Sequence, residues 1–225
     1  MDHKRLTLFA GHYGSGKTNI AVNYALHLAR EGKKVCIADL DIVNPYFRTK
    51  DSAADLQNAG VDLISPQFAN SNVDLPALPA ESYRLVHDRS TYGIMDIGGD
   101  DRGAYALGRF TPFILEENNY RMAFVANRCR PLTRTPEEAL EVMREIEEAC
   151  GLRFTCIVNN SNLGPETTPE DVSGALDYIK ELCILSGLPL WLHTAEASVA
   201  SQLTDLDAPV LPLHLQKKYF DLPTV

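Results

Sequence analysis

Residues Gly11 to Thr18 have the types and the spacing needed to hold phosphate groups. They read Gly-His-Tyr-Gly-Ser-Gly-Lys-Thr, a complete G-x-x-x-x-G-K-[ST] motif. The glycines allow successive backbone N–H groups to turn inward around phosphate oxygens, at the positive end of the helix that follows. Lys17 would reach the β and γ phosphates, and the hydroxyl of Thr18 would take one position on Mg²⁺. The motif therefore predicts a nucleoside triphosphate site made of Gly11, His12, Tyr13, Gly14, Ser15, Gly16, Lys17 and Thr18.

Aspartates at the ends of two apolar runs are candidate ligands for that Mg²⁺. Asp39 and Asp41 end one such run, and Asp96 ends another. An aspartate that ends an apolar strand and is followed by flexible glycines, here Gly98 and Gly99, is typical of a Walker B site. Its carboxylate holds Mg²⁺ directly or through water, while a glycine N–H can approach the γ-phosphate. We therefore predict that Asp96 is a metal ligand.

Local sequence signals predict the elements that would position these residues. Four glycines each precede an apolar run, which is typical of a helix that ends before a strand. Those glycines are Gly32, Gly60, Gly151 and Gly187. Thr135-Pro136 and Thr168-Pro169, each followed by acidic residues, are typical helix N-termini. Expected strands lie at 6–10, 35–38, 61–64, 92–97, 122–126, 154–158, 188–192 and 210–213.

This alternation of helices and strands predicts an α/β fold. Helices that alternate with β-branched, apolar strands are typical of a mainly parallel sheet covered on both faces. We expect seven or eight strands in a single P-loop NTPase domain that spans residues 1–225. The stretch 65–79, rich in Pro, Asn and Ser, is expected to be a surface excursion of this domain and not a linker. In such a sheet, ligands bind at the carboxyl ends of the strands, where the motifs above would meet.

Composition argues against a nucleic-acid or a membrane partner. The 225 residues include 30 acidic and 21 basic side chains, a formal net charge of −9, and no dense cluster of Lys and Arg. No apolar run approaches the length that spans a bilayer. The five cysteines are scattered without a C-x-x-C pair, as in proteins of a reducing compartment. We therefore expect a cytoplasmic protein that binds neither nucleic acid nor membrane.

The chain has a phosphate-binding motif, a D-x-D at Asp39 and Asp41 and a D-x-G-G that begins at Asp96. Together these motifs resemble those of the MinD/ParA/CobQ-type family of P-loop ATPases, of the SIMIBI class. The resemblance covers nearly the whole chain and implies that the P-loop strand lies near the centre of the sheet. It also implies that Asp39 helps to organise Mg²⁺, that Asp41 orients the attacking water in the first switch, and that Asp96 is the Walker B acid. The implied second switch contains Gly98 and Gly99.

One position departs from that family. Many members carry a second lysine directly after the first glycine of the loop, which reaches the phosphates of a partner subunit, and this chain has His12 there. A mostly neutral histidine would stabilise transition-state charge less well than lysine. We therefore expect ATP to promote self-association into a homodimer only weakly, with Lys17 and Asp41 as the catalytic residues. The missing cation could come from Arg48, Arg102, Arg128 or Arg130, among which the sequence does not choose.

The asparagines after the strand at 154–158 bear on the choice of base. Guanine-specific relatives place an aspartate at the last position of this segment, where its carboxylate accepts two guanine N–H groups. Asn162 stands there in this chain and offers only one acceptor oxygen. An asparagine can instead donate to adenine N7 and accept from the adenine amino group. We predict that Asn159 or Asn160 contacts adenine, so that ATP binds better than GTP.

The combined prediction is a Mg²⁺-dependent ATPase. It would use ATP binding and hydrolysis to switch conformation and act on an unidentified protein partner, as relatives do that position other proteins, deliver metals or clusters, or support reductases. The alternative is an ATP-dependent carboxylate ligase resembling dethiobiotin or cobyrinate synthetases, which share this core. A ligase would show ADP production stimulated by its substrate, whereas a switch protein would respond to a protein partner.

Overall fold

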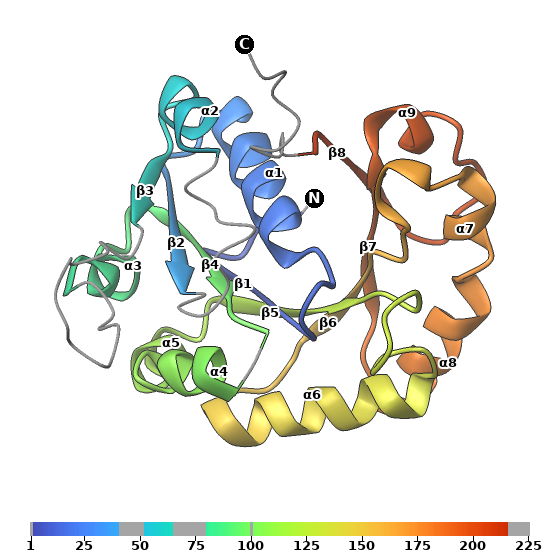
Figure 1. The fold of residues 1–225 in the computed structure, drawn as a ribbon. Helices are drawn as coiled ribbons and strands as arrows, with labels where there is room; N and C mark the ends of the chain where they lie inside the picture. The colour runs from blue at the N-terminus through green and yellow to red at the C-terminus, as the bar shows by residue number, and fades with distance from the viewer. Residues whose placement is uncertain (1, 41–51, 65–79, 100, 216–225) are drawn as a thin grey trace, which may run out of the picture.

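A computed structural model of the chain describes residues 2–40, 52–64, 80–99 and 101–215 (Figure 1). The strands are β1 (Leu6–Ala10), β2 (Val35–Leu40), β3 (Asp62–Ile64), β4 (Tyr92–Ile97), β5 (Tyr120–Ala126), β6 (Cys156–Asn159), β7 (Leu190–Glu196) and β8 (Val210–Leu213). The helices are α1 (Lys17–Arg30), α2 (Ala53–Asn58), α3 (Arg84–His87), α4 (Asp101–Gly108), α5 (Thr111–Glu117), α6 (Pro136–Cys150), α7 (Pro169–Ser173), α8 (Leu176–Ser186) and α9 (Ala197–Ala200). Short 3-10 helices lie at Ala80–Tyr83 and Gly164–Glu166.

The eight described strands form one sheet in the order β3-β2-β4-β1-β5-β6-β7-β8, and each pairing among them is parallel. The predicted α/β class is therefore confirmed, with a sheet that is wholly and not only mainly parallel in its described part. The strand β1, which leads into the phosphate-binding motif, lies between β4 and β5, near the centre. Because parallel strands point the same way, the segments that follow β1, β2 and β4 meet at one edge of the sheet.

Helices cover both faces of this sheet, with α1 and α2 on one face and α4, α5, α6 and α8 on the other (Figure 1). Two hydrophobic clusters correspond to these layers. Leu6 and Leu8 of β1 belong to the cluster that contains residues of α4, α5, α6 and α8, whereas Phe9 belongs to the cluster that contains residues of α1 and α2. Alternate side chains of one strand thus pack into opposite cores, as expected of a central strand that is buried on both faces.

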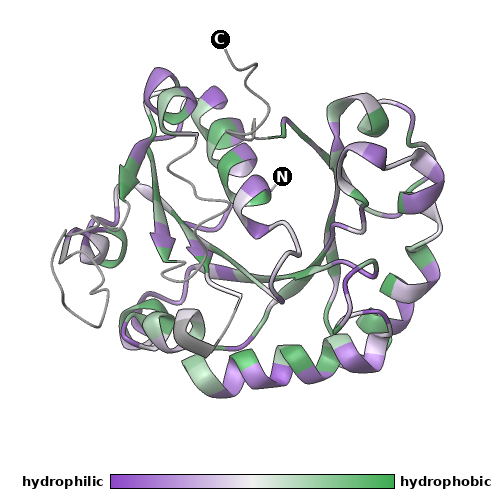
Figure 2. Ribbon diagram, viewed as in Figure 1, coloured by the Kyte–Doolittle hydropathy of each residue, from purple (hydrophilic) through white to green (hydrophobic). Residues whose placement is uncertain are grey.

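Hydropathy follows this layering (Figure 2). Hydrophobic residues run along the strands, while α6 alternates hydrophobic and hydrophilic positions along its length. Ala139 and Met143 of α6 are buried, and its glutamates lie largely toward solvent. This is the pattern of a helix that packs one face against a sheet. Within the described ranges, no helix is both long enough and apolar enough to cross a membrane.

The threonine–proline pairs begin helices, as predicted. The Thr135 and Thr168 side chains each accept a hydrogen bond from the backbone N–H of the third helical residue, and the acidic side chain of that residue bonds back to the threonine N–H. These reciprocal bonds form capping boxes at the starts of α6 and α7. Gly151 and Gly187 follow α6 and α8 with φ of 68° and 71°, a left-handed conformation that favours glycine.

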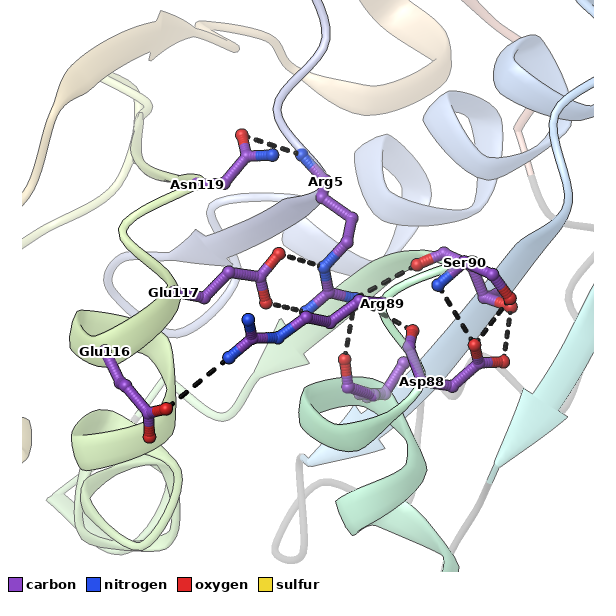
Figure 3. A network of polar contacts seen from close by, with 9 residues as sticks. Arg5, Asp88, Arg89, Ser90, Glu116, Glu117 and Asn119 are labelled. Carbon is purple, nitrogen blue, oxygen red and sulfur yellow. Dashed lines mark hydrogen bonds and ion pairs between the residues drawn. The ribbon is translucent and has the colours of Figure 1, made fainter.

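A buried arginine ties the N-terminal end of β1 to its neighbours (Figure 3). The Arg5 guanidinium forms a two-bond ion pair with the Glu117 carboxylate, and these side chains are only 7% and 9% exposed. Its Nη1 donates to the backbone oxygens of Leu85, Asp88 and Thr91 at 2.9, 3.3 and 3.0 Å. Arg5 therefore links β1 both to the end of α5 and to the turn between α3 and β4.

Arg5→Ala is expected to lower the free energy of unfolding by about 3–5 kcal/mol, because it leaves the Glu117 carboxylate and three carbonyl oxygens without their donor. Urea unfolding of the two proteins measures the difference. Arg89→Ala is the matched control: Arg89 pairs with Glu116 at 3.5 Å nearby, but these side chains are 62% and 72% exposed, so little change is expected. Equal effects of the two substitutions would contradict a structural role for the Arg5 network.

Candidate nucleotide-binding site

The phosphate-binding motif forms a loop between β1 and α1. Gly11, Gly14 and Gly16 have φ of 148°, 74° and 94°, where residues with a side chain are strained. Gly11 also lies against β5, because a β-carbon there would be 2.7 Å from the Val125 oxygen. The loop leads into α1, whose first N–H groups have no partner within the helix. Its backbone conformation thus requires glycine at these three positions and ends at a helix terminus that favours anions.

Lys17 is the first residue of α1, and its charge lies over the loop. The ammonium nitrogen donates to the His12 oxygen at 3.2 Å, and the residue is buried. The Ser15 N–H donates to the same oxygen at 3.1 Å, which closes the loop. His12 is half-buried with its Nδ1 2.9 Å from the Tyr13 oxygen, while Tyr13 is exposed. A phosphate group held by the loop would meet the Lys17 ammonium.

The two described strand-end aspartates lie side by side. Asp39 of β2 and Asp96 of β4 are register partners on adjacent strands, so their side chains point to the same face of the sheet. They are 3% and 1% exposed. Carboxylates buried this close together require compensating positive charge, and such oxygens are ligands that suit Mg²⁺. Thr18, the other predicted ligand, is half-buried in the first turn of α1. The residues present therefore fit a magnesium site.

The glycines after β4 bring that segment into contact with the phosphate loop. A β-carbon on Gly99 would lie 2.7 Å from the Tyr13 nitrogen and 2.9 Å from the Lys17 ammonium nitrogen. Behind it, a β-carbon on Gly103 of α4 would lie 2.6 Å from the Gly98 α-carbon. Real side chains do not come this close, so these contacts exist only because the residues are glycines. The segment predicted as the second switch thus lies between the loop and the start of α4.

Asn160 braces the phosphate loop from the end of β6. Its Nδ2 donates to the Ser15 oxygen at 2.6 Å, and its Oδ1 accepts from the Thr194 hydroxyl at 2.6 Å. A β-carbon on Gly16 would overlap with the Asn160 amide nitrogen, which shows how closely the two residues pack. Each polar atom of this amide keeps capacity for one further hydrogen bond, so a contact with adenine stays a prediction. The role that the structure shows for Asn160 is structural.

Asn159 is engaged with a buried histidine. Its Nδ2 lies 3.1 Å from Nδ1 of His193, and its Oδ1 accepts from the Ser161 N–H at 3.1 Å. Nε2 of His193 lies 3.1 Å from the Asp207 carboxylate. Because the amide donates to Nδ1, we assign the His193 proton to Nε2, which donates to Asp207. An adenine contact from Asn159, which is fully buried, would break this arrangement, so the geometry favours Asn160 over Asn159.

Two of the four candidate arginines have described side chains, and only one of these lies at the loop. The Arg128 guanidinium donates to the Gly174 oxygen at the end of α7. Arg130 packs on the loop, with its Nε and Cδ 3.7 and 3.8 Å from the place of a β-carbon on Gly14. The Arg130 Nε is buried and has no hydrogen-bond acceptor within the described part of the chain. Arg130 therefore presents an unused donor and a positive charge to the phosphate loop.

The remaining predicted residues lie outside the described residues. Asp41 and Arg48 fall in the range 41–51, the predicted surface excursion covers 65–79, and the side chain of Arg102 is not described. The sequence pattern predicted no role for Thr194 or His193, which are polar, fully buried and bonded to the asparagines at the end of β6 and just after it.

A cavity of about 770 Å³ lies on the flank of α1. The cavity is also lined by residues of the segment after β6, of the start of α9 and of α2. Its ionisable lining residues are Asp55, Glu196 and His214, and its lining includes neither a described lysine or arginine nor any residue of the phosphate loop. The volume is that of a small-molecule site, and its charge is acidic.

The described strands and helices form an α/β fold with an all-parallel sheet, and this fold is similar to that of solved FtsY structures. The chain is similar to the cell division protein ftsY from Thermotoga maritima, with 16% identity, a TM-score of 0.58, and coverage of 86% of this chain and 62% of that one. FtsY from Mycoplasma mycoides is 16% identical with a TM-score of 0.55, and the match covers 84% of this chain and 59% of that one. The signal recognition particle 54 kDa protein from Aeropyrum pernix K1, in complex with GDP, is 16% identical with a TM-score of 0.50. That match covers 82% of this chain and 40% of that one.

The chain thus spans about three fifths of the length of the two ftsY chains. Identity at this level shows a shared fold. No family model and no curated protein matches the chain.

Proposed function

We propose that this chain is a Mg²⁺-dependent ATPase that uses nucleotide binding and hydrolysis as a switch acting on a protein partner. The observation that carries the proposal is the meeting of three elements at the ends of β1, β2 and β4. Lys17 lies over the phosphate loop, Asp39 and Asp96 are buried as register partners, and Gly99 contacts both the loop and Lys17. A protein of the same fold has been solved with GDP, which supports nucleotide binding.

The residues of this site have separable roles. The loop N–H groups and Lys17 hold the β and γ phosphates, and Thr18, Asp39 and Asp96 hold Mg²⁺ directly or through water. When bound, Mg²⁺ neutralises charge on the transferred phosphoryl group. Asp41 orients the water that attacks the γ-phosphorus.

Arg130 supplies the cation that His12 does not. Phosphoryl transfer spreads negative charge over the equatorial oxygens of the transferred group, and a guanidinium has donors that match such oxygens. Arg130 packs on Gly14 with a buried Nε that lacks an acceptor in the described chain, while Arg128 is bonded to α7. Of the two described candidates, only Arg130 is placed to act on a phosphate in the loop.

The switch runs from the phosphate loop through Gly99 to α4. A γ-phosphate bound beside Lys17 would contact the Gly99 segment, and its release would allow that segment to move. Because Gly103 packs directly on Gly98, such a movement would shift the start of α4. Nucleotide state would thereby change the surface offered to a partner.

Exposed hydrophobic side chains near the same edge support a protein partner. Tyr13 in the phosphate loop is 53% exposed, Leu132 after β5 is 60% exposed, and Leu163 after β6 is 49% exposed. These side chains follow β1, β5 and β6 at the edge where nucleotide would be bound, so a partner that docks there could contact them. The partner is either another protein or a second copy of this chain, and we expect ATP to promote the latter only weakly.

The alternative, an ATP-dependent carboxylate ligase, needs a site that attracts an anionic carboxylate close to the γ-phosphate. The cavity beside α1 is not that site, because it is lined by Asp55 and Glu196 and by no residue of the phosphate loop. Nucleotide turnover separates the two functions: a ligase would be stimulated by its small-molecule substrate, and the switch protein by a protein partner.

Nucleotide binding and turnover by the wild type and Asp41→Ala test this proposal. We expect Mg·ATP to bind at least about tenfold more tightly than Mg·GTP, or about 1.4 kcal/mol, which is within reach of one bidentate base contact. Asp41→Ala should keep Mg·ATP affinity and lose turnover by at least about 100-fold, because it removes only the group that orients water.

Asn162→Asp is the matched variant for the base. It should narrow the difference between ATP and GTP, because a carboxylate can accept both guanine N–H groups. Equal affinities, or a preference for GTP, would overturn the adenine assignment, and unchanged turnover in Asp41→Ala would remove Asp41 from the mechanism. An absence of nucleotide binding would overturn the whole proposal.

A further inference from the structure

Two histidines and a glutamate gather at the C-terminal end of α1, remote from the phosphate loop. His27 and Glu31 lie one helical turn apart, and His3 comes from the segment that precedes β1. Nε2 of His3 lies 2.9 Å from one Glu31 oxygen, and Nε2 of His27 lies 3.3 Å from the other. One ligand atom from each of the three residues falls within 4.8 Å of the other two.

The spacing of these atoms is close to that of ligands around one metal ion. Ligand atoms about 2.0–2.1 Å from a tetrahedral ion lie about 3.3 Å from one another. The cluster therefore needs only small side-chain movements to place both Nε2 atoms and a Glu31 oxygen around one ion. A water molecule would complete the shell.

The surroundings orient the buried imidazole as a metal ligand. Without a metal, Nε2 of His3 donates to the Glu31 carboxylate at 2.9 Å, and Nδ1, 3.0 Å from the Tyr24 hydroxyl oxygen, accepts from that hydroxyl. A metal ion at Nε2 would take the place of that proton, and the tautomer with the proton on Nδ1 would then donate to the Tyr24 oxygen, the arrangement usual for metal-binding histidines.

The electrostatics of the cluster favour a cation. Glu31 contributes a negative charge to the cluster. They also lie at the C-terminal end of a 14-residue helix, where the helix dipole is negative. The His3 side chain is 9% exposed, whereas those of His27 and Glu31 are 32% and 37% exposed, which leaves an entry path from solvent.

We propose that His3, His27 and Glu31 form a binding site for a divalent transition metal of the Zn²⁺ type. Two imidazoles and one carboxylate suit Zn²⁺ and its first-row neighbours, whereas Mg²⁺ prefers oxygen ligands. The ion would fasten the segment before β1 to the end of α1. Since α1 rises about 1.5 Å per residue, this site lies about 20 Å from the phosphate loop and is independent of it.

Equilibrium dialysis of the full chain against Zn²⁺, without nucleotide and with excess Mg²⁺ to saturate oxygen sites, tests the proposal. We expect one Zn²⁺ per chain, a rise in the melting temperature with Zn²⁺, and the visible absorption of tetrahedral Co²⁺ when Co²⁺ is used instead. His27→Ala and Glu31→Gln should each weaken Zn²⁺ binding by at least about 100-fold, because each removes a ligand. Tyr24→Phe should weaken it about tenfold, as expected for the loss of a group that orients a ligand.

His87→Ala is the control, because it removes an exposed histidine on α3 that is not part of the cluster. Circular dichroism checks that His27→Ala, a substitution on a half-exposed helical face, remains folded. Lys17→Ala should bind Zn²⁺ as the wild type does, which separates this site from the nucleotide site. A wild-type chain that takes up no Zn²⁺, or equal Zn²⁺ affinity in the wild type and His27→Ala, would overturn the proposal.

Discussion

Lys17→Ala is expected to weaken Mg·ATP binding by at least about 100-fold while leaving the fold intact. The Lys17 ammonium lies 3.2 Å from the His12 oxygen and beside Gly99, where the β and γ phosphates would be bound. Hydrogen bonds to charged groups contribute about 1.5–3 kcal/mol each. Contacts with two phosphates would therefore exceed the roughly 2.7 kcal/mol that a 100-fold change represents. Lys17 belongs to neither hydrophobic cluster, so the melting temperature should change little.

Titration calorimetry with Mg·ATP measures this effect, and thermal unfolding checks the fold. Lys33→Ala is the matched control: Lys33 lies past the far end of α1, with its ammonium 5.5 Å from the centre of the Tyr92 ring. That variant removes the same charge without touching the loop, so its affinity for ATP should equal that of the wild type. Tight ATP binding by a folded Lys17→Ala chain would show that the loop does not hold the phosphates.

The elements of the fold followed from local signals in the sequence. The Thr-Pro pairs at Thr135 and Thr168 begin helices because the signal lies within three neighbouring residues, and the structure completes both as capping boxes. Glycines such as Gly151 and Gly187 end helices for an equally local reason, the left-handed conformation. Such signals do not depend on the rest of the chain, so they could be read without a structure.

The end of β7 was harder to predict than these helix ends, because β7 contains buried polar residues. The strand expected at 188–192 runs in the structure from Leu190 to Glu196, and it continues through His193 and Thr194. Polar residues usually mark the end of a buried strand, but these two are fully buried. They are bonded to Asn159, which ends the neighbouring strand β6, and to Asn160, which follows it. Their partners lie more than 30 residues away in sequence. No local pattern could have revealed the pairing.

The same limit applies to the candidate site. The motif itself predicted the positions of the loop glycines and Lys17, because their spacing is a property of one continuous segment. Asn159 or Asn160 was expected to contact the base, which stays a prediction, but the bond from Asn160 to the Ser15 oxygen of the loop was not foreseen. The choice of Arg130 over Arg128 depends on how the turn after β5 folds back over Gly14, which is a tertiary contact.

Arg130→Ala is expected to lower the turnover number for ATP by at least about 100-fold while changing ATP affinity much less. Arginines that contact the transferred phosphoryl group contribute factors of about 10³–10⁵ to turnover, because the charge they stabilise is largest in the transition state. Turns anchor Arg130 beside the loop, with its backbone N–H 3.1 Å from the Asn127 oxygen and its own oxygen 3.3 Å from the Thr133 nitrogen. These bonds fix the backbone of Arg130, and its buried Nε lies against Gly14 of the loop, close to where a phosphate would be bound.

Steady-state hydrolysis and separate binding measurements distinguish this catalytic effect from a structural one, since a role limited to bracing Gly14 would weaken binding and turnover together. Arg130→Lys should recover part of the lost turnover, because it restores the charge without the planar fork of donors. Arg128→Ala is the control, because that guanidinium bonds to the Gly174 oxygen and not to the loop, and its turnover should stay near that of the wild type. If Arg130→Ala hydrolyses ATP at the wild-type rate, the cation that replaces the missing lysine must come from Arg48, Arg102 or a partner subunit.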